Sequence, residues 1–529
     1  MIQDFKYSSD SKIYPFWAKS ADFIRGRDAL GIQNSSISLY SKLLPGMTNL
    51  TLRLRYYGFY LWLLKKYDEL DSNSEFKKSA RGQFNFIRRA ELILAYYMVN
   101  FHKDEQGVIG INFVTKNIDQ HFESGSYNIQ KGADKNKGTV KNSVYWDFNS
   151  GAFGQYYVGS LISLGLVLNS NQNYFRHSDT GLELANAFAE TISFEEQNIF
   201  LNAIKNGKLT YENLSCLQNF ALNKPLNDST EKYFYEKILF GNDGDNYTKR
   251  DGSISEQRKQ TISLFLQYQN NSKGNAWFYF PQKNYSKLLQ NDLSQCRDAE
   301  IGWYLFYLNE QLHYSLETIF WGMLRQMSII VKTTTDFIDH IQYNTVINLN
   351  EKFIKCSEKS LDSFLQNPDW ICTSSYSNLP LIRQNIKMKE DFECIAISIL
   401  TIITIFHENK SKLELLKKYA IDNEIYDKNG NVLLFFIHHF GDLNVSVNDF
   451  IKKIIKCILN DHTIVAYKKM GNNDKNLLKF ILEDNYLIHI ETMEPNFTSP
   501  RLRTLLNFLI DLGLLSKDGL PTQHYVNYI

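Results

Sequence analysis

The sequence predicts a mainly α, multidomain helical protein that carries small winged-helix-like β hairpins. Apolar residues recur at helical spacing over long stretches, as at Phe84, Ile87, Ala90, Leu94 and Met98. Strand-like segments are short and lie beside polar turns. The chain has 529 residues, and a domain usually holds about 100–200 residues, so several domains are expected. Hydrophobic residues make up 43% of the sequence, which is enough to form a core in each domain. An α+β fold with one substantial sheet in 425–490 is the alternative.

Residues 1–150 are expected to form a helical N-terminal domain with a polar loop. Two helices in 35–70 flank a turn at Pro45-Gly46, because proline cannot continue a helix and glycine permits an unusual φ. The run from Tyr56 to Leu64 is almost entirely apolar or aromatic, which predicts a helix buried on all sides. A polar loop rich in glycine follows within 103–150.

Residues 151–240 are expected to contain a winged-helix-like segment and further helices. A short helix at 155–164 leads into the turn Leu164-Gly165-Leu166, then two short strands and a helix that begins near Thr180. Thr180 and Glu183 match a capping box, in which both side chains satisfy free amides at the helix start. Helix, tight turn, two strands and helix is the order of a winged-helix core.

The second half of the chain is divided by composition. Residues 241–275 are rich in Asn, Gly, Asp and Ser and are predicted as a linker. A helical domain at 276–421 follows. The last segment, 422–529, is predicted as a C-terminal α+β module that ends in a second winged-helix-like segment.

This second winged-helix-like segment is predicted from its turn residues. Pro500 suits the first turn of a helix that runs to Asp511, because its missing N–H costs nothing there. The turn Leu512-Gly513-Leu514, the polar turn Ser516–Gly519 and a strand at Tyr525–Ile529 follow. The order of helix, Leu-Gly-Leu turn and wing is thus expected twice, which supports the winged-helix prediction more strongly than a single copy would.

Charge and cysteine content restrict the classes of function. The net charge is +1, from 58 basic and 57 acidic residues, so nucleic-acid binding requires a local basic patch. No two of the six cysteines form a C-x-x-C element. Scattered cysteines in a chain of this size indicate reduced thiols and a cytoplasmic protein. We expect neither a metal nor another cofactor.

No membrane association is expected. Residues 1–15 are polar and lack the apolar core of a signal peptide. The longest apolar run, 394–406, is shorter than the roughly 20 residues of a membrane span. It predicts a buried helix or strand.

The sequence contains no recognisable catalytic motif, including the phosphate-binding glycine loops and H-E-x-x-H. Glu310, His313 and Glu317 share a helix face, as in carboxylate-bridged metal sites, but the second Glu-x-x-His that such sites need is missing. We interpret them as a polar stripe satisfied within a helix bundle. A divergent enzyme such as a metal-dependent nuclease stays the alternative, with this stripe and the loop 103–150 as the first places to look.

Arginines flank the aromatic stretch of the N-terminal domain. Arginine beside aromatic residues can stack on nucleic acid, or it can form ion pairs that fix a helical core. We favour the ion pairs. The residues concerned are Arg25, Arg27, Arg53, Arg55, Arg88 and Arg89.

Several passages resemble an uncharacterised protein family of bacterial phage-defence islands. The matching passages are Arg27-Asp28-Ala29-Leu30-Gly31-Ile32, Leu43-Leu44-Pro45-Gly46-Met47-Thr48-Asn49, Arg53-Leu54-Arg55-Tyr56-Tyr57, Arg88-Arg89-Ala90-Glu91 and Arg501 to Leu515. The resemblance implies a role in defence against foreign DNA, beside a helicase or nuclease partner. It implies no mechanism and no catalytic residues.

These observations lead to a non-catalytic DNA-associated or scaffold subunit of a bacterial antiviral defence system. The DNA contacts are assigned to Arg501 and Arg503 in the first helical turn and to Lys517 in the wing, because a recognition helix meets phosphates with its N-terminal end. The competing interpretation pairs the two arginines with Glu491 or Glu494. The hairpin segments would then serve protein–protein contacts alone, which suits 155–164, where no basic residue occurs.

Overall fold

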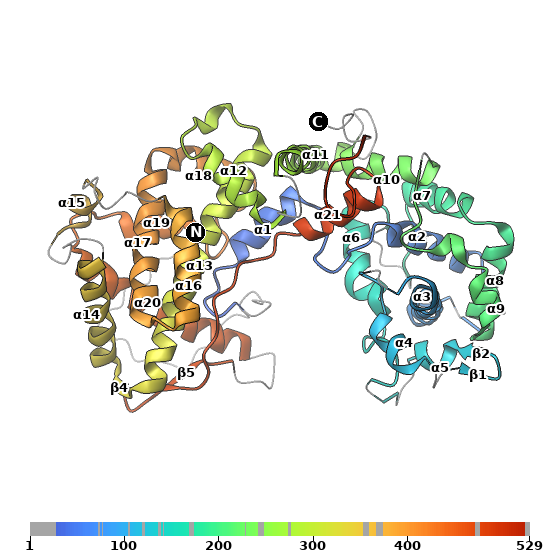
Figure 1. Ribbon diagram of the computed structural model, residues 1–529, viewed down its shortest axis with the longest axis horizontal. Coiled ribbons are helices and arrows are strands. Elements are labelled where there is room, and N and C mark those ends of the chain that lie inside the picture. The colour runs from blue at the N-terminus through green and yellow to red at the C-terminus, as the bar shows by residue number, and fades with distance from the viewer. Residues whose placement is uncertain are drawn as a thin grey trace, which may run out of the picture. The chain divides into compact units, whose positions relative to one another are not determined.

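The computed structural model describes residues 28–71, 75–76, 78–103, 106–118, 122–135, 139–140, 142–168, 174–227, 229–241, 248–272, 277–352, 359–366, 374–470 and 477–523. Most of them are helical, so the predicted mainly α fold is confirmed (Figure 1). The described strands form two small antiparallel sheets, with the strand orders β1-β2-β3 and β4-β6-β5. Arg25, Arg27 and the strand predicted at 525–529 lie outside the described residues.

The chain forms two compact units, and each is assembled from three separate stretches. Unit 1 comprises the described parts of Met1–Gln33, Gln311–His407 and Phe435–Asn496. Unit 2 comprises those of Asn34–Glu310, Glu408–Leu434 and Phe497–Ile529. Neither unit coincides with one of the five contiguous segments into which composition divides the chain.

Unit 2 contains sheet β1-β2-β3 and most of the helices. Its strands are β1 (Phe122–Glu123), β2 (Ser126–Asn128) and β3 (Lys208–Thr210). Its helices are α1 (Asn34–Leu43), α2 (Arg55–Asp68), α3 (Ala80–Phe101), α4 (Ile111–Asn117), α5 (Ile129–Ala133), the π-helix η1 (Phe153–Tyr157), α6 (Val158–Ser163), α7 (Asp179–Glu190), α8 (Phe194–Asn206), α9 (Tyr211–Ser215), η2 (Gln218–Phe220), α10 (Thr230–Phe240), α11 (Thr248–Ser272), η3 (Trp277–Tyr279), α12 (Phe280–Leu288), η4 (Leu293–Gln295), η6 (Lys410–Lys412), α18 (Leu413–Asp422) and α21 (Leu502–Asp511).

Helix α2 is the centre of the unit 2 core. Every residue from Tyr56 to Leu64 is buried, as its uninterrupted apolar composition predicts. Tyr57 contacts Tyr157 on one side and Phe508 of α21 on the other, with ring centroids 5.6 Å apart in both pairs. Gly58 lets α10 approach, because a Cβ there would lie 2.6 Å from the Tyr235 hydroxyl.

The arginines beside α2 and in α3 stabilise this core. Arg53 binds the Asp511 carboxylate at 2.8 Å, and Arg55 binds Glu231 at 3.1 Å. Arg88 donates to three backbone carbonyls, and Arg89 binds Asp134 at 2.7 Å. The expected ion pairs are therefore present for Arg53, Arg55 and Arg89, whereas Arg88 is fixed by backbone carbonyls.

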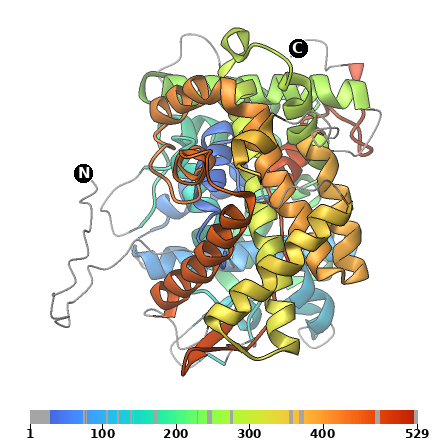
Figure 2. The same ribbon diagram turned by 90° about the vertical axis from the view of Figure 1, so that its left-hand side faces the viewer.

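Unit 1 is a helical assembly with sheet β4-β6-β5 at one end, seen from the side in Figure 2. Its strands are β4 (Lys332–Thr333), β5 (Phe480–Glu483) and β6 (Tyr486–His489). Its helices are α14 (Thr334–Lys352), α15 (Leu361–Leu365), α16 (Ser375–Met388) and α20 (Val447–Met470), and the unit boundaries fall within α13 (Asp298–Ile329), α17 (Asp391–Asn409) and α19 (Val432–Phe440).

The passage around Asp28 is a loop organised by one buried carboxylate. Asp28 accepts backbone amides from all four residues from Leu30 to Gln33, at 2.7–3.2 Å. Gly31 adopts the left-handed φ of 71° that this tight turn requires. Lys469 of α20 donates to the Asp28 carbonyl, so the loop is fixed to the body of unit 1.

The apolar run 394–406 lies within the buried helix α17. The hydroxyl groups of Thr401 and Thr404 donate to the carbonyls of Ile397 and Leu400, one turn earlier. Within the ranges described above, no helix combines the length and hydropathy required to cross a lipid bilayer.

The alternative α+β fold is not borne out. In the described part of 425–490, the strands are β5 and β6, with β4 as their neighbour, and the apolar run 432–437 is helical in α19. Asn309 and Asn431 accept the first amides of α19, from Val432 and Leu433, at 2.9 and 2.8 Å. These side chains start a helix at a position where composition alone favours a strand.

The predicted linker 241–275 contains the helix α11 (Thr248–Ser272). Its buried residues Ile262, Phe265, Leu266 and Gln269 follow helical spacing. Polar residues dominate the helix, but this narrow stripe is enough to pack it against α1 and α10.

Candidate functional site

Unit 2 contains one local structure twice, in a first repeat at 158–168 and 174–178 and a second repeat at 502–522. Each repeat is a helix, a Leu-Gly-Leu turn with a left-handed glycine and one antiparallel bridge between the segments that follow, Val167 with His177 and Leu515 with Pro521. The glycine amide donates to the residue three positions earlier, from Gly165 to the Ile162 carbonyl and from Gly513 to the Ile510 carbonyl, both at 2.9 Å. The next amide donates five positions back, from Leu166 to Leu161 and from Leu514 to Leu509, both at 2.9 Å. A hydroxyl group then donates to the glycine carbonyl, from Ser178 to Gly165 and from Thr522 to Gly513, both at 2.7 Å. The turn is therefore repeated bond by bond.

The helix after the first repeat begins earlier than its sequence predicts. Ser178 is the N-cap of α7, and its hydroxyl accepts the Gly181 amide at 3.0 Å. The capping box predicted at Thr180 and Glu183 is therefore wrong. Ser178 also closes the Leu-Gly-Leu turn, so one side chain ends the hairpin and starts the helix.

The loop 43–49 contacts both repeats. Leu164 of the first repeat lies so close to Gly46 that a Cβ there would meet its side chain at 2.3 Å. From the second repeat, Arg501 donates to the Leu44 carbonyl at 3.1 Å and Thr504 to the Thr48 carbonyl at 2.7 Å. Gly46 and the backbone carbonyls of Leu44 and Thr48 therefore fix both repeats to the loop that precedes α2.

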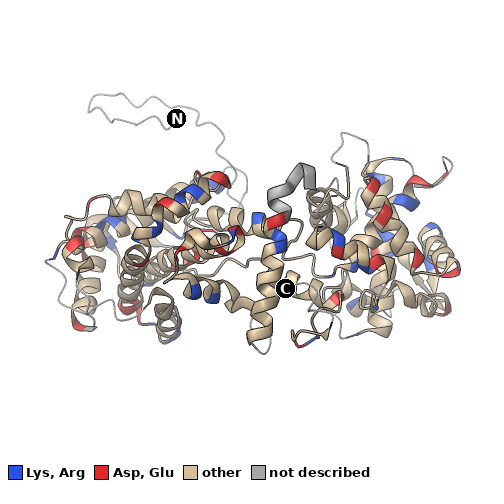
Figure 3. Ribbon diagram, turned by 90° about the horizontal axis from the view of Figure 1, so that it is seen from above, with Lys and Arg blue, Asp and Glu red and all other residues tan. Residues whose placement is uncertain are grey.

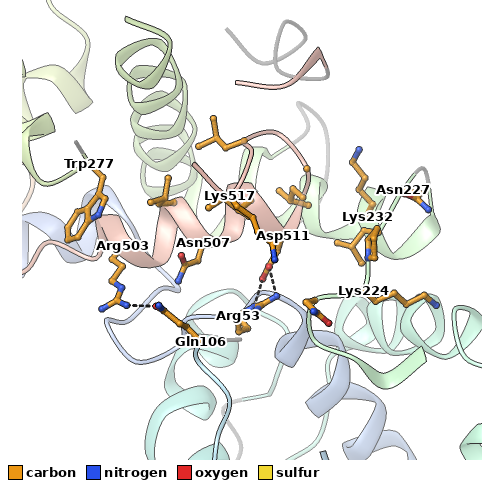
Figure 4. A pocket seen from close by; sticks show the side chains of 18 residues that line it. Arg53, Gln106, Lys224, Asn227, Lys232, Trp277, Arg503, Asn507, Asp511 and Lys517 are labelled. Atoms are coloured by element: carbon orange, nitrogen blue, oxygen red, sulfur yellow. Dashed lines mark hydrogen bonds and ion pairs between the residues drawn. The ribbon is translucent and has the colours of Figure 1, made fainter. Parts of the chain in front are cut away.

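The second repeat lines a pocket of about 1010 Å³ within unit 2. Figure 4 shows Trp277 and Arg503 at one end, and Lys224 and Lys232 at the other. The lining at the Lys224 end includes residues 223–227. The pocket is an elongated cleft along α21.

The lining of this pocket is strongly basic. It contains five cationic side chains and one carboxylate, a difference of four positive charges; the cations are Arg53, Lys224, Lys232, Arg503 and Lys517, and the carboxylate is Asp511. Elsewhere in each unit, basic and acidic residues are interspersed (Figure 3). The pocket is therefore a local basic patch in a chain whose net charge is +1.

The carboxylate of Asp511 is engaged by the fold. It accepts two hydrogen bonds from Arg53, at 2.8 and 3.2 Å, and one from the Leu54 amide at 3.0 Å. Asp511 thus ties the end of α21 to the start of α2 and neutralises Arg53. The remaining cations of the pocket are four lysine and arginine side chains, of which Lys232 lies 3.9 Å from Glu236.

Two of the other cations donate hydrogen bonds to neutral acceptors. Arg503 donates to the side-chain oxygen of Gln106 at 2.7 Å, and Lys224 donates to the Thr191 carbonyl at 2.7 Å. Burial is the largest effect on Lys224 and lowers the pKa of its ammonium group. An anion in the pocket would offset this desolvation.

An aromatic segment, η3, borders the pocket and packs against α21. Trp277 lines the pocket, and the next two residues, Phe278 and Tyr279, are exposed. The rings of Phe278 and Tyr279 lie 4.0 Å apart. Aromatic and cationic side chains therefore meet at one end of the cleft.

The three residues predicted to touch DNA have different environments. Arg503 and Lys517 are exposed and line the pocket. Arg501 does not line it: its guanidinium lies 4.8 Å from the Tyr40 ring centroid and donates to the Ser41 hydroxyl and the Leu44 carbonyl. Burial lowers the pKa of Arg501.

The predicted start of the last helix is also corrected. α21 begins at Leu502, so Pro500 lies outside it, and Arg501 is the N-cap residue with a left-handed φ of 62°. Arg503 remains in the first turn. Glu491, one of the two carboxylates in the competing interpretation, binds Lys479 at 2.5 Å.

Replacing Arg501 by alanine is expected to lower the free energy of unfolding of unit 2 by about 1–3 kcal/mol, because two hydrogen bonds and a cation–π contact are lost. Thermal unfolding measures the loss. Arg503→Ala, at an exposed position, should change stability by less than about 0.5 kcal/mol. Equal losses in the two variants would contradict the structural role of Arg501.

The polar stripe of α13 makes hydrogen bonds to backbone amides. In unit 2, Glu310 accepts the Thr498 amide at 2.6 Å. In unit 1, Glu317 accepts the Asn496 amide at 2.9 Å and lies 3.2 Å from the His313 ring. Across the part of the chain that the structure describes, no group of three His, Cys, Asp or Glu residues is arranged to hold a metal ion.

The chain matches no family model, and comparison with curated proteins and with solved structures gives no match either. The geometry of the pocket is therefore the main indication of function. Sequence reasoning found Arg503 and Lys517 but not Lys224, Lys232 or Trp277, which reach the pocket from distant segments and carry no local motif.

Proposed function

We propose that this chain binds nucleic acid through the basic pocket along α21, as a non-catalytic subunit of a bacterial antiviral defence system. The observation that carries the proposal is the excess of four positive charges among the described residues of one pocket. Phosphate binding by clustered Lys and Arg is the general basis of nucleic-acid affinity. The two helix–hairpin repeats, which are winged-helix-like in their order of elements, agree with it.

The chemistry of the pocket favours binding over catalysis. Its described lining contains no Ser, Cys, His or Tyr that could act as a nucleophile or a general base. Asp511, its carboxylate, is held by Arg53 and by the start of α2. A helicase or nuclease partner would supply the reaction, as the resemblance of the passages around α2 and α21 implies.

Removing Arg503 and Lys517 together should weaken nucleic-acid binding. Arg503→Gln with Lys517→Gln is expected to lower the affinity about 10- to 30-fold, at roughly 1 kcal/mol for each exposed contact. The slope of log affinity against log salt should fall by about 1.4 for a single strand, since each phosphate contact contributes about 0.7. Fluorescence anisotropy with a labelled oligonucleotide over a salt series measures both quantities.

A matched control removes the same two charges elsewhere in unit 2. Lys205 and Lys208 are exposed and do not line the pocket, so Lys205→Gln with Lys208→Gln should leave affinity and salt slope unchanged. Equal weakening by both double variants would reject the pocket. Cleavage of the oligonucleotide by the purified chain in Mg²⁺ or Mn²⁺ would reject the non-catalytic role.

A further inference from the structure

We infer that the ligand of this pocket is a single-stranded nucleic acid, with its phosphates along α21 and a base stacked on Trp277. The inference rests on the proposed function and names its substrate class. A winged-helix unit commonly places its second helix in the major groove of a duplex. The surroundings of α21 argue against that arrangement.

The face of α21 that is not buried is part of the pocket wall. Of its ten residues, Leu502, Thr504, Leu505, Leu506, Phe508 and Leu509 are buried. The remaining four, Arg503, Asn507, Ile510 and Asp511, line the pocket. A helix that reads a duplex inserts its exposed side chains into a major groove about 12 Å wide, but here those side chains face the pocket.

Two side chains in the first turn of α21, which would meet the base edges of a duplex, are hydrogen-bonded to other segments of unit 2. Arg503 donates to Gln106, a residue from a distant segment of unit 2, at 2.7 Å. Thr504 donates to the Thr48 carbonyl at 2.7 Å. A duplex would have to displace these contacts, whereas a single strand can lie within the cleft.

The length of the cleft suits a short single strand. The ten residues of α21 extend for about 15 Å. At about 3.4 Å per stacked nucleotide, this length corresponds to roughly four nucleotides. Lys224 and Lys232 continue the positive charge at the end opposite Trp277 (Figure 4).

The aromatic segment supplies the contact that a duplex cannot use. Bases in a duplex are stacked on one another, whereas bases of a single strand can stack on exposed aromatic rings. Trp277 borders the pocket at the Arg503 end, beside the exposed rings of Phe278 and Tyr279. A cationic cleft with an aromatic platform is the arrangement that sequence-tolerant single-strand binding requires.

The test compares Trp277→Ala with the unmodified chain on single-stranded DNA, single-stranded RNA and the matching duplex. We expect the single strand to bind at least about tenfold more tightly than the duplex, and Trp277→Ala to weaken it about 5- to 150-fold. Trp277→Phe should keep part of the affinity, because a smaller ring still stacks. Phe194→Ala, which removes an exposed aromatic ring outside the pocket, should have no effect.

The outcomes separate this inference from the proposed function. Tight binding of either single strand with loss in Trp277→Ala supports both, and the stronger of DNA and RNA identifies the sugar. Duplex binding as tight as single-strand binding, weakened by the Arg503–Lys517 double variant but not by Trp277→Ala, overturns the inference alone. No binding of any probe overturns both.

Discussion

Replacing Glu231 by alanine is expected to lower the free energy of unfolding of unit 2 by about 3–5 kcal/mol, because it leaves a buried charge without its partner. Glu231 is fully buried and binds Arg55 at 3.1 Å. It also accepts the hydroxyl groups of Tyr235 at 3.0 Å and Thr191 at 3.1 Å. Urea unfolding followed by hydrogen exchange of the α2 and α10 amides assigns the loss to unit 2.

The guanidinium of Arg55 explains why the loss is large. It also donates to the carbonyls of Asn219 and Ala221 at 2.7 and 2.5 Å, so it stays in place when Glu231 is removed. Glu183→Ala removes an exposed carboxylate from α7 of the same unit and should cost less than about 0.5 kcal/mol. A Glu231→Ala variant as stable as this control would mean that the ion pair contributes little.

A double replacement distinguishes the contribution of the Arg55–Glu231 charges from that of side-chain packing. Arg55→Met with Glu231→Leu removes both charges and keeps apolar volume. It is expected to be more stable than Glu231→Ala alone, because an apolar substitute for a buried ion pair avoids its desolvation. This comparison uses the same unfolding measurement.

The sequence predicts best the elements whose burial is decided within one segment. Helix α2 follows from the unbroken apolar run at 56–64, and the repeated Leu-Gly-Leu turns follow from their own glycines. α11 was predicted as part of a linker, because the residues that stabilise it are distant in sequence, and α19 likewise depends on a distant side chain. The stripe of α11 packs on α1, and the first amide of α19 binds Asn309, 123 residues earlier.

The sequence predicts only part of the candidate site, because several of its residues come from segments that are distant in sequence. Arg503 and Lys517 lie in one local motif and were identified from it. Arg501 sits in that motif too, but the Tyr40 ring and the Leu44 carbonyl hold its side chain, and neither is adjacent in sequence. Lys224 and Trp277 join the pocket through folding alone.

The passages that resemble a defence-island family have structural roles where the structure describes them. Asp28 organises a loop, Arg53 joins α2 to α21, and Glu91 is a buried carboxyl group bound by the Tyr60 hydroxyl at 2.7 Å. Burial raises the pKa of Glu91. These contacts hold the fold of each unit, and they assign no reaction to the passages.

Acid is expected to destabilise unit 1 through His462 of α20. The His462 ring is buried, with Nδ1 at 3.0 Å from the Ala29 carbonyl and Nε2 accepting the Lys479 amide at 2.9 Å. Both contacts are satisfied only by the neutral ring with its proton on Nδ1. Burial, together with Lys479 and Lys469, lowers the pKa of His462 from 6.5 to about 4.

The sign of the effect follows from this lowered pKa. Above pH 6.5 the ring is neutral in both the folded and the unfolded chain, so its contribution is fully present. As the pH falls toward 4, the unfolded chain binds a proton that the folded chain excludes, and the contribution is lost. The loss between pH 7 and pH 5 should be about 2 kcal/mol, from about 1.4 kcal/mol per pKa unit.

The variant His462→Gln isolates this contribution, because an amide can donate to Ala29 and accept from Lys479 but does not titrate. Its unfolding free energy should fall less than that of the unmodified chain between pH 7 and pH 5, by about 2 kcal/mol. Burial also lowers the pKa of His439 to about 4, so some acid sensitivity of unit 1 will remain. His438→Gln, at an exposed position of unit 1, should behave like the unmodified chain. If His462→Gln and the unmodified chain lose the same free energy on acidification, His462 is not the group that excludes the proton.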